Sequence, residues 1–174
     1  MKPERERIFV EGLIAGAIGY AGVALFFAAV NVIAGHSPFY TPALLGEALF
    51  YGLADPTQVV IEPGPILAYN GVHLIAFLLL GTVAAALVFE IEHHPQLFYA
   101  VFFLALAFVL LTYGMLLALA TPIASAFPWW AVGGANLLAA VGMGGYLWFV
   151  HPRLREEVRR QDRLEELEAI VPRT

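Results

Sequence analysis

Histidines and glutamates gather where the second of four apolar stretches ends. Residues 90–94 read Glu-Ile-Glu-His-His, and His151 ends the fourth stretch at about the same depth. On a helix, Glu90 and His93 have the i, i+3 spacing used by carboxylate-bridged di-metal bundles. Those sites need that motif twice and two more glutamates, so a mononuclear site of two histidines and a carboxylate is the metal chemistry left. The candidate ligands are Glu90, His93, His94 and His151, and the plainer interpretation is a polar interfacial loop.

His73 is the only histidine inside an apolar stretch. An ionisable residue within a membrane helix is a functional hypothesis by default. His73 could ligate haem b, bind a quinone headgroup or relay protons, and bis-histidine haem ligation would need His36 as the second ligand. The plainer interpretation, which we favour, is a neutral histidine bonded to a backbone carbonyl or to an asparagine such as Asn31.

The elements that position these residues follow from composition. The chain has 174 residues, of which 60% are apolar and 13% charged, whereas soluble domains carry about 25% charged residues. All nine Lys and Arg residues lie in residues 2–7 and 153–173. A charge near the centre of a bilayer costs about 2.5–3.5 kcal/mol, so the long stretch without basic residues predicts an integral membrane protein.

The chain has no cysteine, which excludes disulfides, thiolate metal sites and thiol redox chemistry. A net charge of −5 gives no indication of nucleic-acid binding.

Four stretches have the roughly 20 apolar residues that a span requires. We therefore predict an all-α protein with a four-helix transmembrane domain over residues 1–151 and a cytoplasmic helical tail over residues 152–174. The predicted spans cover residues 8–34, 66–89, 97–121 and 129–150, with an outer loop at residues 35–65.

Both tails carry basic residues close to a span. The positive-inside rule therefore places both termini in the cytoplasm, which requires an even number of spans. The size and simplicity of the chain favour a bacterial inner membrane.

Two shorter helices are expected outside the spans. Thr41 and Pro42 form the pattern of an N-cap followed by proline at the first helical position, so a short apolar helix over residues 43–51 should lie on the outer face of the bundle. The tail over residues 152–174 has a narrow apolar stripe and is predicted to be an amphipathic helix.

Small and amide side chains indicate where the spans touch, because apolar burial does not drive helices together in lipid. The third span is rich in Phe and Leu and should face lipid or a partner subunit. The predicted packing residues are Gly12, Gly16, Gly19, Asn31, Asn70, Gly81, Asn136, Ala140 and Gly144.

These features favour a non-enzymatic accessory, assembly or structural subunit of a larger membrane complex. Its expected partners are the lipid bilayer, other membrane subunits or further copies of the chain. No cofactor is expected on this interpretation. The alternatives are a redox subunit that binds haem, a metal or a quinone through His73 or the His93, His94 and His151 cluster, and an oligomeric transporter or channel for small solutes.

Overall fold

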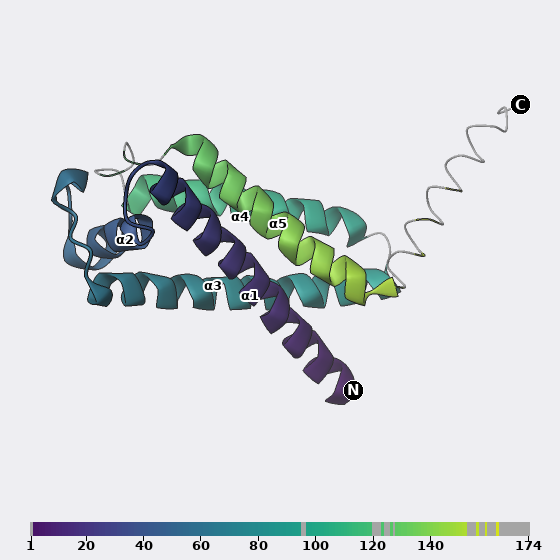
Figure 1. The fold of residues 1–174 in the computed structure, drawn as a ribbon. Helices are drawn as coiled ribbons and strands as arrows, with labels where there is room; N and C mark the ends of the chain where they lie inside the picture. The colour runs from purple at the N-terminus through teal and green to yellow at the C-terminus, as the bar shows by residue number, and fades with distance from the viewer. Residues whose placement is uncertain are drawn as a thin grey trace, which may run out of the picture.

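The structure is a computed structural model and describes residues 2–94, 97–119, 123, 126, 128–152, 156, 159 and 163. Every element in this part of the chain is a helix (Figure 1). The elements are α1 (Lys2–Ile33), α2 (Tyr40–Tyr51), the short 3-10 helix η1 (Pro56–Gln58), α3 (Pro63–His93), α4 (Phe98–Leu119) and α5 (Trp129–Val150).

Three of these helices are long and apolar enough to cross a membrane, counted over the described residues. The qualifying segments are Glu4–Ile33, Pro63–Glu92 and Trp130–Val150. They are compatible with a membrane location, and they coincide with three of the four predicted spans. Helix α1 begins before its predicted span and ends at Ile33, and α3 extends past its predicted span at both ends. Helix α4 is a further long helix within predicted span 97–121.

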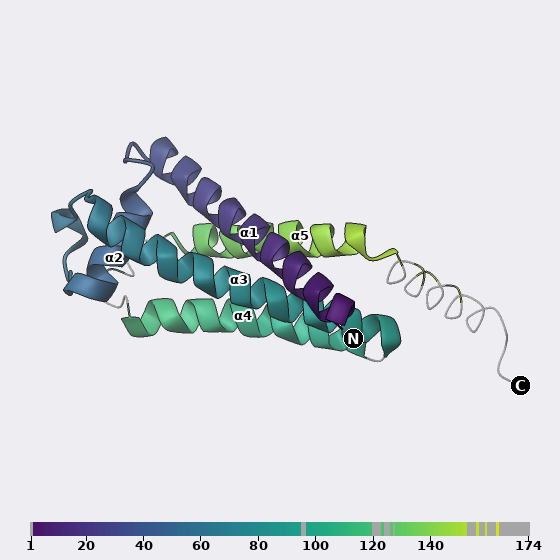
Figure 2. The ribbon, with the colours of Figure 1, turned by 90° about the horizontal axis from the view of Figure 1, so that it is seen from below.

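Helix α1 crosses α3 and α5 diagonally, as the two perpendicular views show (Figures 1 and 2). At the crossing with α3, glycine backbones lie in direct contact. A Cβ added at Gly81 would meet the backbone of Gly12 and Gly16, and one added at Gly16 would lie 2.7 Å from the Cα of Leu78. The absence of side chains is what lets two long helices approach this closely, as in other membrane helix pairs.

Helix α5 packs on the bundle with one face. Val132, Ala135, Ala139, Met143 and Leu147 are buried along that face, and their three- and four-residue spacing places them one above another on a helix.

The predicted packing residues of α5 divide between its two sides. Asn136 is buried, whereas Ala140 and Gly144 lie instead on the exposed side. The reason is angular: each follows a buried residue of the packed face by one position, which turns it about 100° away.

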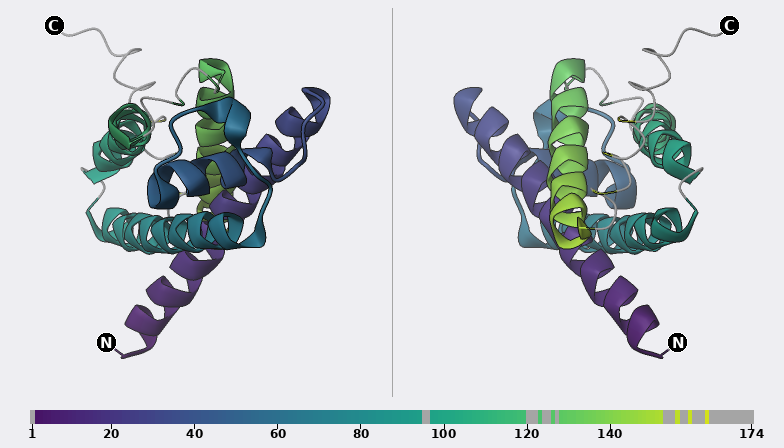
Figure 3. Two further views of the ribbon diagram at one scale, coloured as in Figure 1. Left: turned by 90° about the vertical axis from the view of Figure 1, so that its left-hand side faces the viewer. Right: turned by 90° about the vertical axis from the view of Figure 1, so that its right-hand side faces the viewer.

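Helix α2 covers the end of the bundle at which α3 begins (Figure 3). Leu44 is fully buried against Ile123, so α2 also contacts the segment that follows α4. The helix begins at Tyr40 with Phe39 as N-cap and no side-chain cap, so the prediction of Thr41 as N-cap was wrong. The Thr41 hydroxyl donates instead to Asn31 Oδ1 at 2.9 Å, which ties the loop to α1.

The predicted tail helix over residues 152–174 lies outside the described residues, apart from four positions. Helix α5 is capped by His151, whose backbone N–H donates to the carbonyl of Leu147.

Candidate functional site

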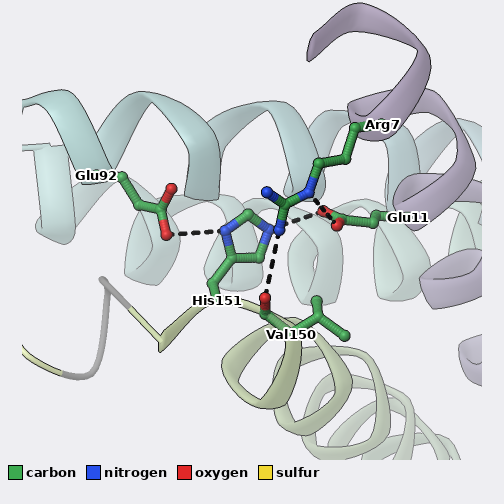
Figure 4. Close-up of polar contacts among 5 residues, drawn as sticks. All are labelled: Arg7, Glu11, Glu92, Val150 and His151. Atoms are coloured by element: carbon green, nitrogen blue, oxygen red, sulfur yellow. Dashed lines mark hydrogen bonds and ion pairs between the residues drawn. The ribbon is translucent and has the colours of Figure 1, made fainter. Parts of the chain in front are cut away.

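Polar side chains of α1, α3 and α5 meet at the end of the bundle opposite α2, which we call the charged end: Arg7, Glu11, Glu92 and His151 (Figure 4). His151 Nε2 lies 2.8 Å from Glu11 Oε2, and Nδ1 lies 3.0 Å from Glu92 Oε1. The His151 side chain is only 2% exposed. A single imidazole ring therefore bridges helices α1 and α3 from the end of α5.

The hydrogen bonds of this bridge depend on how many protons the ring carries. An ionised carboxylate only accepts hydrogen bonds, and a neutral imidazole has a single N–H. Because a carboxylate faces each ring nitrogen, His151 can donate to both Glu11 and Glu92 only when its ring carries both protons. Bonds between charged partners are about twice as strong as neutral ones.

Arg7 pairs with the carboxylate of Glu11. Its Nε donates to Glu11 Oε1 at 2.7 Å, and a terminal nitrogen donates to the carbonyl oxygen of Val150 at 3.4 Å. Both oxygens of Glu11 are thus occupied, one by Arg7 and one by His151. The four side chains thus form one polar cluster across three helices, which we call the charged clamp.

The predicted metal ligands do not converge here. Glu90 and His94 are exposed, and the side chain of His93 lies outside the described part. Among the members of that set whose side chains are described, only His151 joins the cluster, and its two nitrogens face carboxylates on opposite sides of the ring. No group of three or more His, Asp or Glu in the described residues has an arrangement that could hold a metal ion.

The sequence interpretation missed Glu92 and Glu11 as partners of His151, and it missed Arg7 as the partner of Glu11. One signal was available: Glu11 stands at the entry of an otherwise apolar span, and an acid in that position is normally paired. The partner itself could not be read from the sequence, because His151 is 140 positions away.

A second polar group lies at the opposite end, around a partly open cavity of about 170 Å³ between α1, α3 and the start of α2. We call it the His73 cavity, and its lining includes Tyr20, Phe27, Pro42, Tyr69, Asn70 and His73. The Tyr20 hydroxyl donates to Asn70 Oδ1 at 3.1 Å, and Asn70 Nδ2 donates to the carbonyl of Ile66. Asn70 therefore joins α1 to α3 at the cavity wall.

His73 lies among aromatic rings. Tyr69 stacks on it with a centroid distance of 5.2 Å, and its hydroxyl is 3.5 Å from His73 Nδ1. The other nitrogen, Nε2, is buried and has no hydrogen-bond partner among the described residues. The expected bond between His73 and Asn31 is not formed, since Asn31 pairs with Thr41 and the carbonyl of Pro38.

The other predicted cofactor ligand, His36, is exposed and stacks on Tyr40 with a centroid distance of 4.4 Å. It is absent from the lining of the His73 cavity. The two histidines proposed for a haem are therefore not brought to one described site.

Comparisons with protein-family models, with curated proteins and with solved structures found no match for this chain.

Proposed function

We propose that this chain is a four-span integral membrane protein that acts as a non-enzymatic accessory, assembly or structural subunit of a larger membrane complex. The fourth span would be α4. Its 22 residues extend about 33 Å at 1.5 Å per residue, which is close to the roughly 30 Å of a hydrocarbon core. No residue of α4 carries a charge.

In this proposal the charged end faces the cytoplasm and α2 faces outward. Support comes from the basic residues: Lys2, Arg5 and Arg7 precede the first span, and the other six follow His151. Short basic tails beside a span are retained on the cytoplasmic side. A bacterial inner membrane is part of the proposal.

A structural role is supported by how the interhelical polar groups are used. The ring of His151 joins three helices, Asn31 ties α1 to the loop before α2, and Tyr20 with Asn70 ties α1 to α3. These bonds give the bundle a fixed shape, which a subunit needs if neighbouring proteins are to recognise it.

The support for a partner subunit comes from a row of small residues on the exposed side of α5, which we call the α5 stripe. Ala140, Gly144 and Gly145 are exposed, and a Cβ added at either glycine would meet nothing within 4 Å. Leu137 and Val141 continue this face and are 66% and 62% exposed. Small residues four positions apart are typical of close helix contacts in membranes. A helix face that contacts only lipid has no need of small residues at these positions. We infer that a helix of another subunit or of a second copy packs there.

Purification in mild detergent tests the proposal. The native protein should elute as a particle much larger than one chain, with co-purifying subunits or further copies identified by mass spectrometry. Gly144→Leu should reduce the particle to a single chain while leaving the helical content unchanged.

Gly71→Leu is the matched control, because Gly71 also lies on an exposed helix side with nothing within 4 Å. It should leave the large particle intact. A wild-type protein that runs as a clean monomer would contradict the partner proposal, and equal loss of the particle in both variants would contradict the α5 stripe.

A further inference from the structure

Helix α2 lies across the bundle rather than along it. In Figure 1 it is seen almost end-on while α3 runs across the picture, and in Figure 2 it lies crosswise to α3. The two helices touch at Gly46, where an added Cβ would meet the backbone carbonyl group of Pro65 in the first turn of α3. The backbone N–H of Val60 donates to Glu47 Oε1 at 3.0 Å, which ties the following loop to α2. Helix α2 is therefore held crosswise at the start of α3.

The length of α3 gives the depth of this contact in a bilayer. Pro65 precedes Glu92 by 27 residues, or about 40 Å along a helix. A bilayer measures about 40–45 Å with both headgroup layers included, and its hydrocarbon core about 30 Å. Glu92 belongs to the charged clamp, and charged groups are costly in the hydrocarbon core, so it lies in one headgroup layer. Pro65 then lies in the opposite headgroup layer, and α2 lies there with it.

The exposed side chains next to this contact suit that depth. The buried residues of α2 lie between Thr41 and Gly46. Large rings are exposed at both ends of the helix, Phe39 at its start and Phe50 with Tyr51 at its end. Aromatic residues are enriched where acyl chains meet the headgroups of a membrane. A helix held in this layer places both sets of rings at one depth, because its axis runs along the membrane surface.

The charges of this end indicate the kind of lipid. Residues 35–65 include Glu47, Asp55 and Glu62 and contain no Lys or Arg. A layer of anionic headgroups attracts basic residues, by about 1 kcal/mol for each Lys or Arg near the surface, and it repels carboxylates. A zwitterionic headgroup carries an ammonium as well as a phosphate and has no net charge. Zwitterionic phospholipid is therefore the better match for this end of the protein.

We propose that α2 is an in-plane interfacial helix that contacts the headgroup layer of zwitterionic phospholipids in the outer leaflet. Phe39, Phe50 and Tyr51 then lie at the level where the headgroups meet the acyl chains. The contact holds the start of α3 at a fixed depth. This inference rests on the transmembrane arrangement proposed above, and it adds a lipid-binding surface that is separate from the α5 stripe.

Spin labels on single cysteines test the depth of α2, because the chain has no cysteine of its own. The full-length variant Phe50→Cys is labelled in phosphatidylcholine vesicles, and its collisions with oxygen and with a water-soluble nickel chelate are measured. Oxygen concentrates in hydrocarbon and the chelate in water, so the ratio of the two collision rates reports depth. Tyr51→Cys repeats the measurement at the neighbouring ring.

Two further variants calibrate the scale. Leu79 is exposed on α3 and follows Pro65 by about 21 Å along the helix, so a label at Leu79→Cys should lie near the middle of the bilayer. Glu4 is exposed before the first span, so a label at Glu4→Cys should lie in water. The oxygen-to-chelate ratio at Phe50→Cys should be several-fold above that at Glu4→Cys and several-fold below that at Leu79→Cys.

Three outcomes would overturn the inference, and they differ in what else they remove. A water-like ratio at Phe50→Cys with a hydrocarbon-like ratio at Leu79→Cys would remove the interfacial helix alone. A Phe50→Cys label that is shielded from both reagents would show that another protein covers α2. A water-like ratio at Leu79→Cys would remove the transmembrane arrangement as well.

The lipid class is tested by repeating the measurement in vesicles of phosphatidylglycerol, which is anionic. The oxygen-to-chelate ratio at Phe50→Cys should fall in these vesicles, because the carboxylates of the outer loop are repelled from the surface. The ratio at Leu79→Cys should stay the same. An equal or higher ratio at Phe50→Cys in the anionic lipid would contradict the preference for zwitterionic headgroups.

Discussion

Two histidines, His151 and His73, lie near opposite ends of the bundle and are used in opposite ways. His151 is buried with a carboxylate on each ring nitrogen, whereas His73 is half-buried and its buried Nε2 has no partner among the described residues. Along α3 the partner Glu92 and His73 are 19 residues apart, or about 28 Å. A histidine with both ring nitrogens bonded to other helices holds those helices together, whereas His73 is held mainly by the aromatic rings around it. The difference lies in the neighbours of each ring, since the side chain is the same.

The largest effect should come from breaking the charged clamp. His151→Ala leaves Glu11 and Glu92 facing one another with side chains only 13% and 9% exposed, and removing one partner of a buried ionic cluster typically costs about 3–5 kcal/mol. Reversible unfolding of the detergent-solubilised protein, followed by circular dichroism, measures this loss. His94→Ala changes an exposed histidine and should have little effect; equal losses would show that the clamp contributes nothing special.

A smaller loss is expected at the cavity wall. Tyr20→Phe removes the hydroxyl that donates to Asn70 and keeps the ring, so the free energy of unfolding should fall by about 1 kcal/mol. The same unfolding experiment applies. A loss as large as that of His151→Ala would mean that the two ends contribute equally to stability.

The ion pair between Arg7 and Glu11 should contribute still less to the stability of the protein. The Arg7 side chain is 55% exposed, and exposed ion pairs contribute about 0–1 kcal/mol. Arg7→Gln is therefore expected to cost about 0.5 kcal/mol in low salt and less in high salt. A loss above 2 kcal/mol that persists at high salt would show that the guanidinium, and not the His151 ring, secures Glu11.

His73→Phe should have the smallest effect on the stability of the ligand-free protein. The unpartnered Nε2 is removed, and the aromatic contacts with Tyr69 and Phe77 keep a ring of similar size. We expect the free energy of unfolding to change by less than about 0.5 kcal/mol, in either direction. A loss of several kcal/mol would identify His73 as a second structural bridge and would remove the comparison drawn above.

Helix positions followed from the sequence with little ambiguity. Residues 129–150 were predicted as a span and form α5 with the same bounds, because Pro128 and the His151-Pro152 pair interrupt a continuous apolar run. The segment before α2 was less predictable. Thr41 has the pattern of an N-cap, but its hydroxyl bonds Asn31, and local capping preferences yield to such tertiary contacts.

Small residues gave a mixed outcome for a related reason. Gly12, Gly16 and Gly81 all lie at the crossing of α1 with α3, while Ala140 and Gly144 lie on the open side of α5. A small-residue motif indicates that a helix can be approached closely. It does not indicate which neighbour approaches, or whether that neighbour belongs to the same chain.

By itself, the sequence determined a set of long apolar helices with charges confined to the tails, because hydropathy and proline act locally along the chain. Only the tertiary structure decided that His151 meets Glu11 and Glu92 rather than Glu90 and His94, and that His73 keeps an unused nitrogen. Those pairings depend on how α1 crosses α3 and α5, and one added or lost residue turns a side chain by about 100° around its helix. The chemistry of each histidine is therefore a property of the packed bundle.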